Sequence, residues 1–224
     1  SWSSLQLLLF LPAGKSGIFL VWKTMKGVKK MIKKDGNTMI IDTFRDLKSS
    51  SAEFNKAKRK TVKLIVKSAE HDQKVIDIIN TLKEMRDLEW VEIQNPDAKL
   101  CSIDGMLYSR NGKNLYFCAR TGAVEIPDGT KTICEGAACN CMLSELIIPD
   151  SVKYIKNFAF FGSYMLKEVK GGSGITDIGD SVFLNCVRLK KFNIGKNMKH
   201  IGAGAFANTG LTEINLPDGL KSVG

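Results

Sequence analysis

The C-terminal half of the chain repeats itself every 22 or 23 residues, and this period constrains the fold more than any other feature. One apolar column steps by 22, 23, 23 and 22 residues through Ile133, Ile155, Ile178, Ile201 and Val223. Three further columns keep the same register: Ala138, Phe160, Phe183 and Phe206; Leu143, Leu166, Leu189 and Leu211; Leu146, Val169, Phe192 and Ile214. Four columns in one register indicate a structural repeat.

Each repeat also carries turn residues at a fixed place. Ile126-Pro127-Asp128-Gly129 recurs as Ile148-Pro149-Asp150-Ser151 and as Leu216-Pro217-Asp218-Gly219. Proline fixes φ and cannot donate to a strand ladder, so it ends a strand, and the Asp and Gly that follow it favour a turn. A unit of this length cannot bury its apolar face alone, so its neighbours must stack on it. The sequence therefore predicts an α/β repeat fold, a solenoid built from a strand plus a short helix or turn in each unit.

Several segments match a known repeat pattern, approximately L-xx-I-xIP-xx-V-xx-I-G-xx-A-F-xx-C-xx-L. They are Leu143 to Pro149, Phe183-Leu184-Asn185-Cys186 and Ile201-Gly202-Ala203-Gly204-Ala205-Phe206. Residues 88–224 thus resemble the BspA-like leucine-rich-repeat family. The resemblance implies a leucine-rich-repeat solenoid in a bacterial or protist surface or secreted protein that acts in adhesion and in host or matrix binding. Gly171-Gly172-Ser173-Gly174 and Ile194-Gly195-Lys196 depart from the pattern, so we expect irregular turns there.

Three regions follow from these patterns. Residues 124–224 hold the regular repeats. Residues 61–123 predict a degenerate first repeat, with a strand at Thr61 to Lys67 and a helix whose apolar face runs from Val75 to Met85, followed by a β-hairpin at Asn111-Gly112. Residues 1–60 form a basic N-terminal segment that we expect to be helical or to cap the solenoid.

The positive charge is concentrated in that first segment. Residues 1–60 contain 13 Lys and Arg against 4 Asp and Glu, a net charge of +9, whereas residues 61–123 balance at 9 against 9 and residues 124–224 at 11 against 10. Lys23 to Lys34 carries six lysines in a pattern typical of an amphipathic basic helix. We expect this helix to cap the solenoid or present a solvated face. Contact with an anionic membrane is the alternative, and nucleic acid is not an expected partner.

No catalytic, cofactor or metal site is predicted. Gly14-Lys15-Ser16 lacks the earlier glycine of a phosphate-binding loop, because Leu9 stands in its place. Neither His71 nor His200 has a nucleophile and an acidic residue at a recognisable spacing for a catalytic triad. Cys134, Cys139 and Cys141 lack the C-x-x-C pairs of zinc sites, and Cys141 and Cys186 fall in the repeat's own cysteine column, where a thiol packs as a small apolar group. A disulfide and a metal cluster remain alternatives for these cysteines.

Strand alternation predicts which side chains face solvent. We expect Leu146, Ile148, Val169, Phe192, Ile194, Ile214 and Leu216 to point inward. The candidate binding face is then the set of outward residues Glu125, Glu145, Ile147, Glu168, Lys170, Lys191, Asn193, Glu213 and Asn215. Two further candidates are the hairpin tip from Arg110 to Lys113 and the exposed loop residue Tyr164.

The expected function is therefore binding without catalysis. The first hypothesis is an adhesion module with a protein or matrix ligand, or a glycan, located at the cell surface or secreted as the resemblance implies. The alternative is an intracellular interaction scaffold whose basic N-terminus contacts membrane or nucleic acid. An enzyme would require residues 1–60 to belong to a catalytic domain. The chain stops in mid-repeat at Gly224, so we also expect a longer array or end-to-end association there.

Overall fold

The computed structural model describes residues 18–21, 31–41, 43–44, 47, 58–67 and 74–224. The chain divides into two compact units, Ser1–Leu100 and Cys101–Gly224. Each unit is described by itself.

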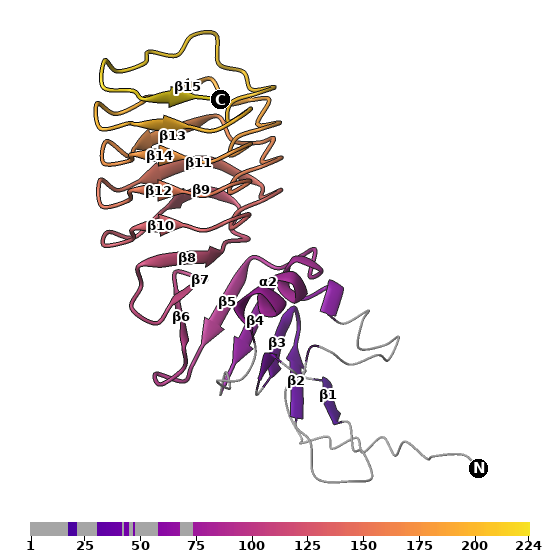
Figure 1. The fold of residues 1–224 in the computed structure, drawn as a ribbon. Coiled ribbons are helices and arrows are strands. Elements are labelled where there is room, and N and C mark those ends of the chain that lie inside the picture. The colour runs from indigo at the N-terminus through magenta and orange to yellow at the C-terminus, as the bar shows by residue number, and fades with distance from the viewer. Residues whose placement is uncertain (1–17, 22–30, 42, 45–46, 48–57, 68–73) are drawn as a thin grey trace, which may run out of the picture. The chain divides into compact units, whose positions relative to one another are not determined.

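The N-terminal unit contains a five-stranded sheet in the order β1-β2-β3-β4-β5 (Figure 1). The strands are β1 (Ile18–Val21), β2 (Met31–Asp35), β3 (Thr38–Ile41), β4 (Lys63–Val66) and β5 (Trp90–Ile93), and helix α2 (Val75–Lys83) connects the last two. The first three strands pair antiparallel, whereas β3, β4 and β5 pair parallel.

The parallel part of this sheet lies partly within residues 61–123, where a degenerate first repeat was predicted. Thr38 pairs with Lys63 and Lys63 with Trp90, so corresponding positions lie 25 and 27 residues apart (63 − 38 and 90 − 63). Burial alternates along β3 and β4, and α2 buries Ile78, Ile79 and Leu82. We propose that this segment extends the repeat architecture with longer, less regular units. The division between the two units falls after Leu100, inside the segment predicted as 61–123.

The predicted basic helix at Lys23 to Lys34 is wrong in the part that the structure describes. Residues 31–34 belong to β2, which pairs with β1 on one side and β3 on the other. Pairing on both edges satisfies the backbone of this short segment, and such tertiary context overrides a weak helical periodicity. The preceding residues, 23–30, lie outside the described part of the chain.

The C-terminal unit is a solenoid whose coils contribute to two sheets. A four-stranded parallel sheet, the long-strand sheet, contains β9 (Gly122–Glu125), β11 (Leu143–Ile148), β13 (Glu168–Gly171) and β15 (Lys191–Phe192). The short-strand sheet contains the parallel strands β10 (Thr132–Ile133), β12 (Tyr154–Ile155), β14 (Asp177–Ile178), β16 (His200–Ile201) and β17 (Ser222–Val223). Figure 1 shows these coils stacked one on the next. The leucine-rich-repeat solenoid predicted from the period is confirmed.

The short-strand sheet begins with β6 (Leu100–Ile103), β7 (Met106–Ser109) and β8 (Asn114–Phe117). Strand β7 pairs antiparallel with β8 across residues 110–113, and the register shifts between Leu107 and Tyr108. Gly112 has a φ of 68°, while Asn111 keeps a negative φ, so this loop is wider than a two-residue turn with positive φ at both positions. Strand β8 then pairs parallel with β10 and so continues into the regular coils.

Backbone hydrogen bonds between coils fix the register that the sequence shows. Ile133 pairs with Ile155, Ile155 with Ile178, Ile178 with Ile201 and Ile201 with Val223, which is the predicted column. Four of these five residues are almost completely buried, while Val223 is 57% exposed. The apolar columns therefore form continuous ladders through the unit.

The segments between the two sheets are turns, and no helix occurs in residues 101–224, all of which the structure describes. Of the two forms predicted for the second part of each unit, a short helix or a turn, the structure has the turn. Four successive turns each have two residues of positive φ, at the equivalent positions Gly136, Phe158, Ser181 and Gly204 and again at Asn140, Gly162, Asn185 and Asn208. A left-handed residue every four positions interrupts a right-handed helix. The turn backbone instead donates to the next coil, as the amides of Phe160 and Phe183 do to the carbonyls of Val182 and Ala205.

A stack of phenylalanine rings fills the core beneath these turns. The Phe160 and Phe183 rings are 5.3 Å apart with an interplanar angle of 3°, and those of Phe183 and Phe206 are 5.5 Å apart at 13°. Phe183 is fully buried and touches a ring on each side. It is therefore the central packing residue of the predicted aromatic column.

Replacing Phe183 with alanine should lower the free energy of unfolding by about 3–5 kcal/mol, because the substitution leaves a cavity between two rings. Urea denaturation followed by circular dichroism measures the change. Phe158, whose side chain is 41% exposed, is the matched control, and Phe158→Ala should cost less than about 1 kcal/mol. Equal losses for the two variants would contradict the stacked core.

Candidate functional site

The outward side chains of the long-strand sheet form two rows. One row contains Ala123, Glu145, Glu168 and Lys191, and the other contains Glu125, Ile147 and Lys170, with each residue paired to the next in the parallel register. Leu146, Val169 and Phe192 lie between the rows and are buried. We call this surface, together with Asn193, Glu213 and Asn215, the long-strand face.

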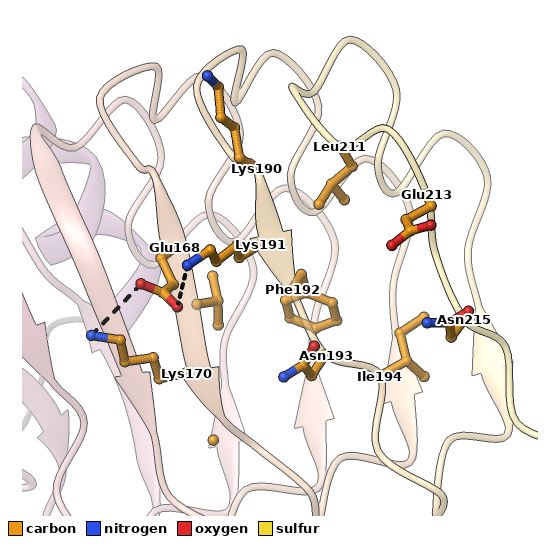
Figure 2. Close-up of a pocket in the computed structure, with 12 residues that line it drawn as sticks. Glu168, Lys170, Lys190, Lys191, Phe192, Asn193, Ile194, Leu211, Glu213 and Asn215 are labelled. Atoms are coloured by element: carbon orange, nitrogen blue, oxygen red, sulfur yellow. Dashed lines mark ion pairs between the residues drawn. The ribbon is translucent and has the colours of Figure 1, made fainter.

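Charges of both signs contact one another on this face. Lys170 Nζ lies 3.1 Å from Glu145 Oε2 and 3.7 Å from Glu168 Oε2, and Lys191 Nζ lies 4.0 Å from Glu168 Oε1. Figure 2 shows Glu168 between the two lysines. The hydrogen bond to Glu145, with the attraction of both carboxylates, raises the pKa of Lys170 above its ordinary value. The lysine therefore stays protonated, while both partners remain accessible to solvent.

A hollow of about 500 Å³ opens beside these ion pairs (Figure 2). Its polar lining includes six of the nine residues predicted for the binding face: Glu168, Lys170, Lys191, Asn193, Glu213 and Asn215. Phe192, Ile194 and Leu211 supply the apolar part of the lining. Gly171, with a φ of 78°, belongs to the wall, and a Cβ there would collide with the Ile148 carbonyl.

The remaining predicted residues divide into two groups. Glu125, Glu145 and Ile147 lie on the same face but not in the hollow. Tyr164 is 46% exposed, and the hairpin tip is exposed at Arg110, Asn111 and Lys113, but neither lines the hollow.

Leu216 was predicted to point inward, and this is wrong, because its side chain is 49% exposed. Residues 211–217 form no strand, so the alternation that holds in β11 and β13 does not apply to them. The same irregularity leaves Glu213 and Asn215 at the edge of the hollow, where they line it without strand pairing. Strand alternation in the sequence predicted the rows of outward residues, but no sequence pattern indicated the hollow.

The sequence-family model of the BspA-type leucine-rich repeat region matches residues 111–224, about half of the chain, with 6 copies of the repeat. The chain belongs to the BspA-type leucine-rich-repeat family. Proteins of this family are generally non-catalytic repeat proteins that present binding surfaces.

Solved structures of bacterial proteins, several of them described as leucine-rich-repeat proteins, resemble the chain. The pneumococcal vaccine antigen PcpA is 19% identical with a TM-score of 0.57, covering 73% of this chain and 44% of that one. A leucine-rich cell surface protein from Faecalibacterium prausnitzii is 21% identical with a TM-score of 0.54, covering 72% and 47%. The T. pallidum leucine-rich-repeat protein is 27% identical with a TM-score of 0.49, covering 51% and 57%. The chain thus spans about half the length of these proteins. No curated protein shows significant sequence similarity to it.

The cysteine column of the BspA-type repeat contributes hydrogen bonds as well as packing. The thiols of Cys141 and Cys186 donate to the carbonyls of Cys118 and Phe160 in the preceding coil, at 2.7 and 3.2 Å. Ser163 occupies the column between them and donates to the Ala138 carbonyl at 2.9 Å. All six cysteines are free thiols. The column therefore ties neighbouring coils together beneath the turns.

The remaining candidates for a chemical role are the histidines, groups of metal-ligating side chains and Gly14-Lys15-Ser16. His200 is exposed, and its Nδ1 lies 2.9 Å from Ser222 Oγ. Within the described part of the chain, no three His, Cys, Asp or Glu side chains come together in a group able to hold a metal ion. Among the same residues, no helix is long and apolar enough to cross a bilayer. His71 and Gly14-Lys15-Ser16 lie outside the described residues.

High pH should destabilise the fold through two thiols, the buried Cys186 and the half-buried Cys134. Burial raises the pKa of Cys134 to about 11 and that of Cys186 to about 12, from an ordinary value of 9.0. The folded state then binds more protons than the unfolded state between pH 9 and those values, so stability is retained below pH 9 and falls as pH rises above it. Urea unfolding at pH 7, 9 and 10.5 measures the decline. Cys134→Ala/Cys186→Ala should show a shallower decline between pH 9 and 10.5, and an unchanged slope would contradict the role of these thiols.

Proposed function

We propose that the chain is a non-catalytic binding module of a cell-surface or secreted protein, and that its long-strand face contacts a protein ligand. The observation that carries this proposal is the hollow of about 500 Å³, because it joins a charged rim to an apolar strip on an otherwise regular solenoid surface. Stacked repeats create extended surfaces of this kind, which proteins use to bind other macromolecules. The general character of the family supports the absence of catalysis.

The chemistry of the hollow favours a protein over a small molecule. Its rim carries carboxylates and ammonium groups only 3.1 to 4.0 Å apart, and its apolar part is limited to residues such as Phe192, Ile194 and Leu211. Small-molecule sites are mostly apolar and enclose their ligand. A protein surface, by contrast, presents charges of both signs around an apolar side chain that could enter the hollow.

The ion pairs on the rim can exchange partners at little cost. Exposed pairs of this kind contribute only about 0–1 kcal/mol to stability, so a ligand's own charges can replace one partner without weakening the fold. Glu168 contacts Lys170 and Lys191 at once, so a ligand carboxylate that takes one lysine leaves the other pair intact. We infer that the ligand brings an acidic group next to an apolar side chain.

The location of the protein is proposed from its relatives. One solved structure with the same fold is described as a leucine-rich cell surface protein and another as a vaccine antigen. Exposure outside the cell, on a surface or after secretion, is consistent with an adhesion role toward host or matrix proteins.

A binding screen against purified extracellular-matrix and serum proteins tests the proposal. At least one should bind the chain in surface plasmon resonance. The variant Lys170→Glu/Lys191→Glu should weaken that interaction at least tenfold, because reversing both charges removes the two ammonium groups that would bind a carboxylate of the ligand. Lys156→Glu/Lys196→Glu, which makes the same charge change outside the long-strand face, should leave the affinity within about twofold. Equal weakening by both double variants would contradict the assignment of the face, and binding to none of the proteins would contradict an adhesion function.

A further inference from the structure

A column of lysines runs along the edge of the short-strand sheet, where each residue immediately precedes the outward residue of its strand. The column consists of Lys113, Lys131, Lys153, Thr176, Lys199 and Lys221, so five of its six positions are lysine. We call it the lysine ladder. Its lysines are exposed except for Lys153, which is half-buried.

Backbone hydrogen bonds show that these residues lie directly above one another. The amide of Lys131 donates to the Lys113 carbonyl at 2.8 Å, and that of Lys153 to the Lys131 carbonyl at 2.9 Å. The bonds continue from Thr176 to Lys153, from Lys199 to Thr176 and from Lys221 to Lys199, at 2.9, 2.8 and 2.8 Å. Adjacent strands lie about 4.8 Å apart, so the ladder spans about 24 Å in single file.

The acidic groups near the ladder do not neutralise it by ion pairing. Among the described residues, no carboxylate lies within ion-pair distance of the five lysines. Two carboxylates do lie near it: Asp128 attracts Lys131 without forming an ion pair, and Asp177 accepts a hydrogen bond from Thr176 Oγ1. The long-strand face differs, because its lysines contact glutamates.

The outward row beside the ladder carries polar side chains, one of which is the carboxylate of Asp177. It contains Asn114, Thr132, Tyr154, Asp177, His200 and Ser222, in register from coil to coil. Amide and hydroxyl groups are suited to the hydroxyls of a sugar chain. A single strand of nucleic acid would instead require a series of aromatic rings for its bases, and Tyr154 is the only tyrosine, tryptophan or phenylalanine in this row. Residues 101–224 also contain no helix to enter a DNA groove.

We propose that the lysine ladder binds a linear acidic polysaccharide, whose carboxylate or sulfate groups follow the lysines along the solenoid axis. Neighbouring lysine positions are about 4.8 Å apart along the backbone, except across Thr176, and their charges repel one another. A chain of anionic groups in single file relieves that repulsion. The ligand lies along the short-strand sheet, so this surface is separate from the long-strand face and does not depend on it.

Binding of heparin, as a sulfated polysaccharide, and of polygalacturonate, as a carboxylated one, to the protein of residues 1–224 tests the proposal. Affinity for at least one should fall steeply as salt rises from 50 to 200 mM. Lys131→Gln/Lys153→Gln should weaken binding at least tenfold and reduce the slope of log K against log salt by about 1.5, the change expected for two lost ionic contacts. Lys167→Gln/Lys196→Gln removes the same charge outside both faces and should leave affinity within about twofold.

The basic segment of residues 1–60 is a competing anion site, so the contact is also mapped directly. Acetylation of surface lysines, read by mass spectrometry, should show Lys131, Lys153 and Lys199 protected by the bound polysaccharide. The proposal is overturned if neither polysaccharide binds at 50 mM salt, if the two double variants weaken binding equally, or if only lysines of residues 1–60 are protected. It is also overturned if a single-stranded oligothymidylate binds more tightly than both polysaccharides.

Discussion

Hydrogen bonding between successive coils is the constraint on which the rest of the C-terminal unit depends. The coils contain no helix. Some turn amides bond to a carbonyl three residues earlier, as Ala137 does to Cys134, but the strands and other turn amides pair with the coils on either side. The pairing occurs in both sheets and also in the turns, where the amides of Ala138, Phe160 and Phe183 donate to the following coil. Register is therefore fixed at three places around each coil, and a side chain at one repeat position necessarily lies over its equivalents.

This constraint explains why much of the fold was readable from the sequence. Once the period was found, the ladder from Ile133 to Ile201 and the rows through Glu145 and Lys170 followed from counting. The structural features that were not predicted correctly depend on local backbone conformation and tertiary contacts, which the repeat period does not indicate. Phe158 and Ser181 adopt a positive φ although neither residue type signals it, so the sequence left the choice between a short helix and a turn open. Leu216 lies where no strand forms, and β2 is set by its two neighbouring strands instead of its own pattern.

The stacking also explains why candidate binding surfaces come as rows. A regular coil repeats one environment every 22 or 23 residues, so a charge placed once becomes a line of charges if the residue recurs. On the long-strand face the recurring residues differ in sign and pair with one another, and the departure from regularity at residues 211–217 adds a hollow. On the short-strand sheet lysine recurs without pairing. The lysine ladder was visible in the sequence two residues before each aliphatic position, but only the register showed that its members are stacked.

Hydrogen–deuterium exchange of the full chain tests the central claim, that the turns are held by bonds between coils, most directly. The turn amides of Ala138, Phe160 and Phe183 should exchange as slowly as the strand-edge amides of Lys153 and Lys199, because both sets donate to neighbouring coils at 2.7 to 3.0 Å. The two sets should also lose protection together as urea is added. Turn amides that exchange at the rate of an unstructured peptide, while the strand-edge amides stay protected, would contradict the account.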